Sequence, residues 1–403
     1  MRSGAPVLAV LALAWLALAA LGVGCAPARH YEAALVLHDL AAAAGASPLK
    51  RATPTPLRET VSYVVEGRVR RADLYLPAPL EGCMARHARP SAPCPRAALV
   101  AVPGVVPLAN RDPRFTALAV TLARAGFAVL APEMPGFRAL RVRPHDAQEV
   151  ADAFRHVASR AELAPSGRAG LFAFSYAVGP AVLAALDDDI GERVRFIAAL
   201  GGYHDLSRAI RFFTTGWYEH EGAWHTLAPD DSGRMVLAFS SLDYLGEPGD
   251  EAVFAAMVAL RLRQPAADLT ALAAGLSESG RAVYALATNT DPHRFAALFE
   301  RLPPAMRADL RALDLAAHDL AGLRARLWLV HGRNDNLIPW PESLALATAA
   351  PAGQARVFLI DRVVGHVDFT VSSTLSRRFW TEDLPDLWRL WRVIDLLLAE
   401  REP

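Results

Sequence analysis

The sequence lacks an excess of either charge: among its 403 residues, Lys and Arg together number 42, and so do Asp and Glu. A nucleic-acid-binding surface has to neutralise phosphates and therefore needs a basic excess, which this composition does not supply. We expect no nucleic-acid partner. Apolar residues make up 53% of the chain, which is ample for a buried core in one large domain with an insertion, or in two domains.

A metal-binding motif is also missing. The nearest approach is HEGAWH at residues 220–225, whose two histidines, His220 and His225, are five positions apart and separated by a glycine. The zinc motif H-E-x-x-H places its histidines four apart on one face of a helix. We therefore expect neither a metal nor another cofactor.

Cysteine is scarce, with Cys25, Cys83 and Cys94 in the whole chain. Cys25 follows an almost uninterrupted apolar segment, residues 5–23, which Arg2 precedes, and this order is typical of an export signal. A cysteine directly after small residues is similar to a bacterial lipoprotein box, in which the cysteine receives lipid. An uncleaved signal anchor, for which the segment is just long enough, and plain secretion are the alternatives. All three export the rest of the chain, and we favour a lipid anchor in the cell envelope, on the non-cytoplasmic side of the membrane.

The other two cysteines flank a short loop, residues 84–93, between two segments that resemble strands. In an oxidising compartment, a disulfide between Cys83 and Cys94 would close this loop. Two unpaired cysteines are the alternative, because the sequence does not show how closely the Cβ atoms approach.

The run LFAFSYAVGP, residues 171–180, is the segment around which the other predicted functional residues are arranged. An apolar strand-like segment ends at Ser175, and small residues then begin a helical segment, residues 177–186. At such a turn a hydroxyl projects from the end of a sheet, and the first N–H groups of the helix point toward any oxyanion formed beside it. Ser175 is therefore a candidate nucleophile, and the alternative is a serine that only caps the helix.

Strand-like and helical segments alternate on both sides of Ser175. Residues 59–66 and 69–76 indicate a hairpin at the edge of a sheet. The spacing of the other segments predicts a mostly parallel central sheet with flanking helices, an α/β fold. Buried strands are expected at 97–104, 127–131, 196–200, 327–330 and 356–360, and helices at 31–46, 114–125 and 147–161.

Several motifs in this order resemble the α/β-hydrolase superfamily over about residues 97–205 and 320–400. The Ser175 turn is similar to the G-x-S-x-G nucleophile elbow, with Ala173 and Ala177 in place of both glycines. Three further runs match family segments in order and spacing: 102–105 the oxyanion loop, 126–136 the G-F-x-V-x-x-P-D-x-P-G run, and 331–339 the H-G-x-x-D-x-x-I-P segment.

The resemblance implies a catalytic triad in the chain order Ser, Asp, His. Ser175 would attack, His366 after the last strand would take its proton, and Asp335 would hold the imidazole. The backbone N–H groups of Tyr176 and Val105 would receive the oxyanion. Imidazole suits this task near neutral pH because its unperturbed pKa is about 6.5.

Three other aspartates lie after a strand-like segment or beside His366. Asp205, after the strand that follows the nucleophile, is the alternative acid. Asp361 and Asp368 flank His366 but are badly placed to brace it.

The pattern changes after residue 205, where helical segments dominate and where family members often insert a helical cap. We expect five parts: an export segment 1–25, an N-terminal helix and linker 26–56, a first core part 57–205, a cap 206–320 and a second core part 321–403. Cap helices are expected at 206–214, 252–263, 269–287, 294–302 and 306–313. The cap aromatics would line an acyl pocket or form only the cap's own core: Trp217, Tyr218, Trp224, Phe239 and Tyr244.

Three classes of function follow. The first is a serine hydrolase that cleaves a carboxylic ester or related acyl bond of a small or lipid-like substrate through an acyl-enzyme. The second is a peptidase or carbon–carbon hydrolase on the same fold; dehalogenation and epoxide opening there use an aspartate nucleophile, so Ser175 argues against both. The third is a non-catalytic envelope protein that keeps the scaffold.

Overall fold

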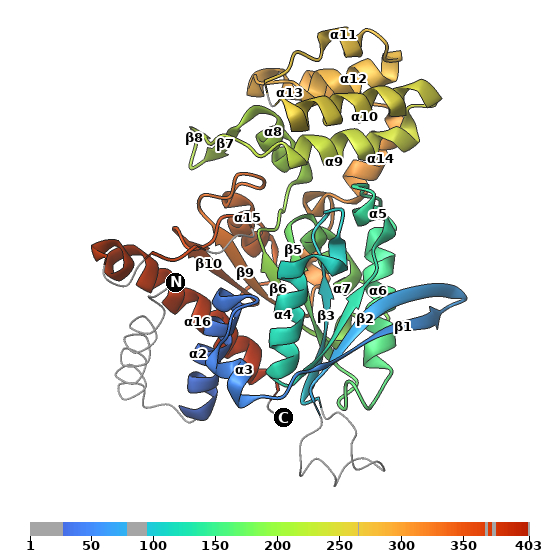
Figure 1. Ribbon diagram of the computed structural model, residues 1–403. Coiled ribbons are helices and arrows are strands. Elements are labelled where there is room, and N and C mark those ends of the chain that lie inside the picture. Colours follow the sequence, from blue (N-terminus) through green and yellow to red (C-terminus); the bar gives the residue numbers. More distant parts are fainter. Residues whose placement is uncertain (1–26, 79–94, 265, 367–369, 373–375, 402–403) are drawn as a thin grey trace.

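A mostly parallel sheet of eight strands runs through the centre of the protein (Figure 1). The computed structural model describes residues 27–78, 95–264, 266–366, 370–372 and 376–401. β2 pairs antiparallel with β1 and β4, and every later pair is parallel. The strands follow the order β1 (Leu57–Val65), β2 (Arg68–Leu76), β4 (Phe127–Pro132), β3 (Ala97–Val102), β5 (Ala169–Phe174), β6 (Val194–Leu200), β9 (Arg326–Gly332) and β10 (Ala355–Ile360). This order and pairing are those of the α/β-hydrolase fold, so the expected fold class is confirmed.

Helices cover both faces of the sheet, because its strands are apolar on both sides. In β3, Leu99 and Ala101 join one buried cluster while Val100 and Val102 join the other, as the two-residue period of a strand requires. The first face carries α2 (Pro27–Ala42), α3 (Pro48–Ala52), α4 (Pro113–Arg124) and α16 (Leu384–Ala399). The second carries α6 (Asp146–Ala158), α7 (Val178–Ala185) and α15 (Pro341–Ala349).

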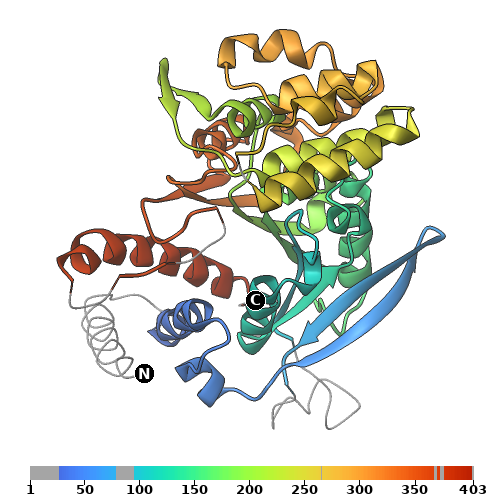
Figure 2. The ribbon, with the colours of Figure 1, turned by 45° about the horizontal axis from the view of Figure 1, so that its top comes forward.

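Between β6 and β9 the chain forms a separate helical layer, here called the cap, which lies beyond one end of the sheet (Figures 1 and 2). Its helices are α8 (Leu206–Thr215), α9 (Ser232–Ser241), α10 (Pro248–Arg263), α11 (Thr270–Ala273), α12 (Glu278–Ala287), α13 (Phe295–Phe299) and α14 (Pro304–Ala312). A hairpin of β7 (Trp217–His220) and β8 (Ala223–Thr226) completes it.

The cap prediction needs correction at three points, the first of which is that helix α9 was not predicted. The single helix expected over residues 269–287 is two helices, because Ser277 caps α12 and its own N–H and hydroxyl both donate to the buried carboxylate of Asp250. The β7–β8 hairpin was not predicted at all. Its turn, Glu221-Gly222, has positive φ at both residues, 51° and 75°, which is the backbone of a tight two-residue hairpin loop.

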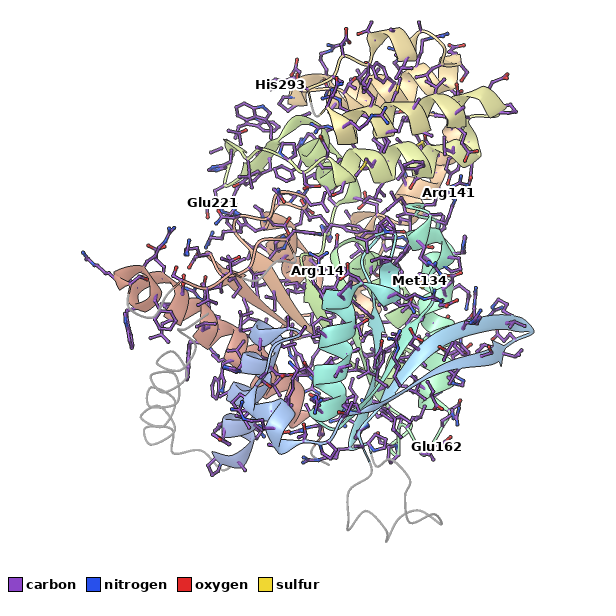
Figure 3. The ribbon with its side chains drawn as sticks, viewed as in Figure 1. Arg114, Met134, Arg141, Glu162, Glu221 and His293 are labelled. Atoms are coloured by element: carbon purple, nitrogen blue, oxygen red, sulfur yellow. The ribbon has the colours of Figure 1, made fainter. Side chains whose placement is uncertain are left out.

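Hydrogen bonds and ion pairs fix the cap to the rest of the protein at several places, two of which involve Glu342 and Arg141. Glu342 of α15 is buried and accepts the N–H groups of His204 and Asp205, where the chain enters the cap. At the second place, Arg141 donates to Asp243 of the cap at 2.6 Å. Figure 3 shows Arg141 at the level where cap and core meet.

The predicted export segment and disulfide, with Cys25, Cys83 and Cys94, lie outside the described residues, so both stay predictions. None of the helices in the described part of the chain is long and apolar enough to cross a membrane.

One prediction follows from the packing inside the sheet. A Cβ atom at Gly170 of β5 would lie 2.1 Å from the ring of Phe196, which is itself stacked on Trp328. Gly170→Ala should therefore lower the free energy of unfolding by about 1–3 kcal/mol through overpacking. The matched control is Gly249→Ala in α10, where an added Cβ meets nothing within 4 Å. It should raise stability by up to about 1 kcal/mol. Urea denaturation measures both; equal shifts would contradict this account of the sheet.

Candidate active site

Ser175 stands at the sharp turn between β5 and α7. It begins a single 3₁₀ turn, η3 (Ser175–Ala177), and is buried. Its φ of 54° lies in the left-handed region, which costs a non-glycine residue about 1–3 kcal/mol. The N-cap residue of α7 is Ala177 and not Ser175, so the alternative of a helix-capping serine does not hold. The methyl groups of Ala173 and Ala177 are fully buried, and the turn forms with both alanines in place.

Asp335 and His366 meet beyond the ends of two neighbouring strands, β9 and β10. The Nδ1 atom of His366 lies 2.8 Å from Oδ2 of Asp335. The other oxygen of Asp335 accepts the backbone N–H groups of Leu337 and Ile338, each at 2.9 Å. The sequence prediction that pairs these two side chains agrees with this geometry.

Two residues of the H-G-x-x-D segment, His331 and Gly332, allow Asp335 and His366 to approach each other. Neither role was predicted. His331, at the end of β9, is fully buried, with its Nε2 atom 3.2 Å from Oδ2 of Asp335 and its Nδ1 atom 2.7 Å from Oγ of Ser343. Gly332 is needed for space, because a Cβ there would lie 2.3 Å from the carbonyl oxygen of Val364 in the segment that leads to His366. The only signal in the sequence was the H-G-x-x-D spacing itself.

The charge on Asp335 is stabilised by these neighbours. Burial alone would raise the pKa of this carboxyl, but the charge of His366 and the hydrogen bonds from His331 and His366 lower the pKa well below its ordinary value. Asp335 is therefore ionised throughout the neutral range. An ionised carboxylate only accepts, so Nδ1 of His366 must be the protonated nitrogen and Nε2 is left to act as a base.

Gly201 shows how close this pair is to the serine turn. β6 lies between β5 and β9, and its register pairs Leu200 with Phe174, so Gly201 and Ser175 are the next residues of adjacent strands. Gly201 has a φ of 66°, and a Cβ there would lie 3.0 Å from Oδ2 of Asp335 and 3.3 Å from Nδ1 of His366. The acid–base pair therefore rests against the backbone beside the strand end that carries Ser175.

The two predicted oxyanion donors flank the same strand. Tyr176 follows Ser175 directly, and Val105 lies in the loop after β3, which pairs with β5 up to Val102 and Ala173. This loop turns back on itself through a hydrogen bond from the Val106 N–H to the Gly104 carbonyl. Among the described residues, the N–H of Val105 donates no backbone hydrogen bond, so it is available to a ligand.

Asp205, the alternative acid, has a structural task. Its Oδ1 atom accepts the N–H of Arg208 at 2.8 Å and the hydroxyl of Ser207 at 2.7 Å, so the carboxylate caps α8. Asp361 forms ion pairs with Arg333 and Arg389, in agreement with the view that it does not brace His366. Asp368 lies outside the described residues.

Three of the five cap aromatics make contacts with other residues of the cap. Tyr218 packs edge-on against Phe212, and the hydroxyl of Tyr244 donates to Asp309 at 2.6 Å. Trp224 is 39% exposed and stacks with the guanidinium of Arg211.

The HEGAWH run forms the β7–β8 hairpin and not a helix. The rings of His220 and His225 lie 6.2 Å apart there. Within the described ranges, no three His, Cys, Asp or Glu side chains are grouped so that they could hold a metal ion.

Comparison with known proteins gives distant structural similarity. No family model matches the sequence, and no curated protein matches it. The rice cell wall degrading esterase LipA from Xanthomonas oryzae is 15% identical, with a TM-score of 0.48 over 86% of this chain and 91% of that one. An esterase domain from Rhodothermus marinus is 14% identical, with a TM-score of 0.39 over 85% and 97%. An acylaminoacyl peptidase is 10% identical, with a TM-score of 0.45 over 87% of this chain, which spans 42% of the peptidase. The assignment of the fold follows from the strand order itself.

The contact at Gly201 leads to a prediction. Gly201→Ala should lower kcat by about 10- to 100-fold, because the methyl group displaces the Asp335–His366 pair by part of an ångström and the residue must also keep a positive φ. Steady-state kinetics on a p-nitrophenyl ester would measure the effect, with folding checked by circular dichroism. Gly322→Ala, where an added Cβ meets nothing within 4 Å, is the control. Equal activity of the two variants would refute the placement of the pair.

Proposed function

We propose that the protein is a serine hydrolase that cleaves an ester or related acyl bond. The observation that carries the proposal is the 2.8 Å contact between Nδ1 of His366 and the buried, ionised carboxylate of Asp335, beside the strained serine turn. Such a contact selects the imidazole tautomer that can accept a proton at Nε2.

The chemistry then has two halves. In the first, Oγ of Ser175 attacks the acyl carbon while Nε2 of His366 takes its proton, and Asp335 stabilises the imidazolium. The N–H groups of Tyr176 and Val105 receive the negative charge of the tetrahedral oxygen; one such donor is worth about 10²–10³ in kcat. Collapse expels the leaving group with the proton from His366, and water repeats the sequence on the acyl-enzyme.

A carboxylic ester is the substrate class that we propose, with a small or lipid-like acyl group. An open hollow of about 360 Å³ is lined by Pro107, which follows the oxyanion loop, and by Glu133, Pro135, Arg138 and Ala139. We propose it as the space for the acyl group. Peptidase and carbon–carbon hydrolase activities use the same triad, and graded series of esters, anilides and β-diketones would separate the three.

The triad makes a quantitative prediction. Ser175→Ala and His366→Ala should each lower kcat on a p-nitrophenyl ester by about 10⁴- to 10⁶-fold, and the double variant should lose little more, because the two residues act as one unit. Asp335→Asn should cost up to about 10⁴-fold because it favours the wrong tautomer.

The control for the acid is Asp205→Asn, which affects the cap of α8 and the ion pair with Arg208 and should keep kcat near the parent value. A folded Ser175→Ala variant with parental turnover would overturn the proposed function. A non-catalytic protein would also leave Ser175 unlabelled by a fluorophosphonate probe.

We also propose that a lipid on Cys25 holds the protein on the non-cytoplasmic side of a membrane. The apolar run of residues 5–23 supports this proposal. Exposed aromatics on α2 and on the C-terminal helical segment support it further. Tyr31 of α2 is 61% exposed, Trp380 in the turn η9 (Phe379–Asp383) before α16 is 46% exposed, and Trp388 of α16 is 39% exposed. The two helices are joined by a hydrogen bond from the indole of Trp391 to the carbonyl of His30. Tyr and Trp are the residues that favour a membrane–water interface.

Replacing the proposed lipid site tests this anchor. Cys25→Ser should release the protein from the membrane fraction and abolish labelling by a fatty-acid probe, since the thiol is the site of attachment. Fractionation and labelling in the native host measure both. Retention of an unlabelled variant at the membrane would favour an uncleaved anchor, and a soluble parent protein would favour secretion.

A further inference from the structure

Tyr176, the residue after the candidate nucleophile, is held at its far end by a buried carboxyl group. The hydroxyl of Tyr176 donates to Oδ2 of Asp146 at 2.9 Å, and both side chains are buried. The tyrosine ring also packs edge-on against Phe137 at 5.6 Å and stacks on Tyr203 at 6.1 Å. The side chain is thus fixed along its whole length.

Asp146 is itself fixed from two sides. It is the first residue of α6, where the free N–H groups of the helix favour a negative charge. Its Oδ2 atom accepts a second hydrogen bond, from the backbone N–H of Arg143 at 2.8 Å.

The cap holds the segment that carries this carboxyl group. The guanidinium of Arg143 binds Asp243 and donates to the carbonyl of Ser240 at 3.2 Å. The N–H of Val142 donates to the hydroxyl of Ser240 at 3.1 Å. Asp146 is therefore attached to both the core helix and the cap, and it has little freedom to move.

We propose that Asp146 is a positioning residue of the oxyanion site: by holding the side chain of Tyr176, it fixes the direction of the Tyr176 backbone N–H beside Ser175. The proposal rests on the proposed function. The backbone of this turn is strained at Ser175, so it needs support from outside, and the side chain of Tyr176 is the nearest attachment on its helical side. A shift of about 1 Å in such a donor can cost about 100-fold in rate.

The ionisation of Asp146 gives this role a pH signature. Burial raises the pKa of Asp146 to about 7, although the Arg143 N–H and the Tyr176 hydroxyl oppose the shift; Glu149 raises it further and the Arg143 charge lowers it. The ionised form accepts the stronger hydrogen bond from Tyr176. Since the folded pKa lies above the ordinary carboxyl value of about 4, folded protein binds more protons between these values. The stability contributed by Asp146 is therefore present at low pH and is lost as pH rises through about 7.

The first test compares Tyr176→Phe and Asp146→Asn with a matched control, Tyr203→Phe, which keeps the ring that stacks on Tyr176 and removes only the hydroxyl. Tyr203 is also a buried tyrosine whose hydroxyl makes one hydrogen bond, to the carbonyl of Leu313 at 2.9 Å. Tyr176→Phe and Asp146→Asn should each lower kcat on a p-nitrophenyl ester about 10- to 100-fold, with KM changed much less. The double variant should have a kcat no lower than that of the less active single variant. Affinity for a boronic acid that mimics the tetrahedral state should fall in parallel. The control should lose stability and keep kcat.

The second test uses pH. We expect kcat/KM of the parent, divided by kcat/KM of Asp146→Asn, to rise as pH increases through about 7. Both proteins share the triad, so its titration cancels in this ratio and only the titration of Asp146 remains. The asparagine variant should also lack the loss of stability that the parent shows over pH 4–7.

These outcomes separate two failures. If Ser175→Ala is inactive but Tyr176→Phe and Asp146→Asn keep the parental kcat and boronate affinity, the positioning role is wrong and the proposed function stands. If Tyr203→Phe loses as much kcat as Tyr176→Phe, the effect is general packing and the inference fails. If Asp146→Asn does not fold, Tyr176→Phe alone decides, because it removes one oxygen atom and keeps the ring.

Discussion

The burial of the Asp335 carboxylate is the constraint on which the rest of the site depends. A charge with 1% exposure is costly unless hydrogen bonds replace its water, and four contacts do so here: two backbone N–H groups on Oδ1, and His331 and His366 on Oδ2. Those contacts require that β9 end in a tight turn, that β10 lie beside it, and that Gly332 leave space between them. The parallel sheet thus places the buried carboxylate of Asp335 next to His366.

The turn at Ser175 has a different requirement. Its backbone is strained, so neighbouring groups must stabilise its conformation and not a buried charge. The backbone at Ser175 has a positive φ, and two buried alanines stand where glycine would relieve crowding. Support comes from helix α7 below, from Tyr176 with its partner Asp146, and from the flat contact between Tyr176 and Tyr203. Both halves of the site are therefore held by buried polar groups that do not themselves react.

The sequence allowed the sheet to be predicted because apolar runs of six or seven residues indicate strands that are buried on two faces. The acid–base pair was predicted from the resemblance of residues 331–339 to a family segment and from the spacing of His366 after the last strand. The roles of Asp146 and of the helix division at Ser277 leave no local pattern, and the H-G-x-x-D spacing includes His331 without showing its contacts. Their roles depend on partners that the fold brings from 30, 12 and 27 positions away, namely Tyr176, Ser343 and Asp250.

The cap contacts the same two loops that hold the reacting groups. The N–H of Asp230 donates to the carbonyl of Asn336, the residue after Asp335, while Arg143 joins Asp243 to the segment that carries Asp146. The cap therefore fixes the acid loop on one side of Ser175 and the tyrosine support on the other. Because close-packed interiors transmit strain, a displacement of the cap would be felt at both supports. The geometry of the site therefore depends on the position of the cap.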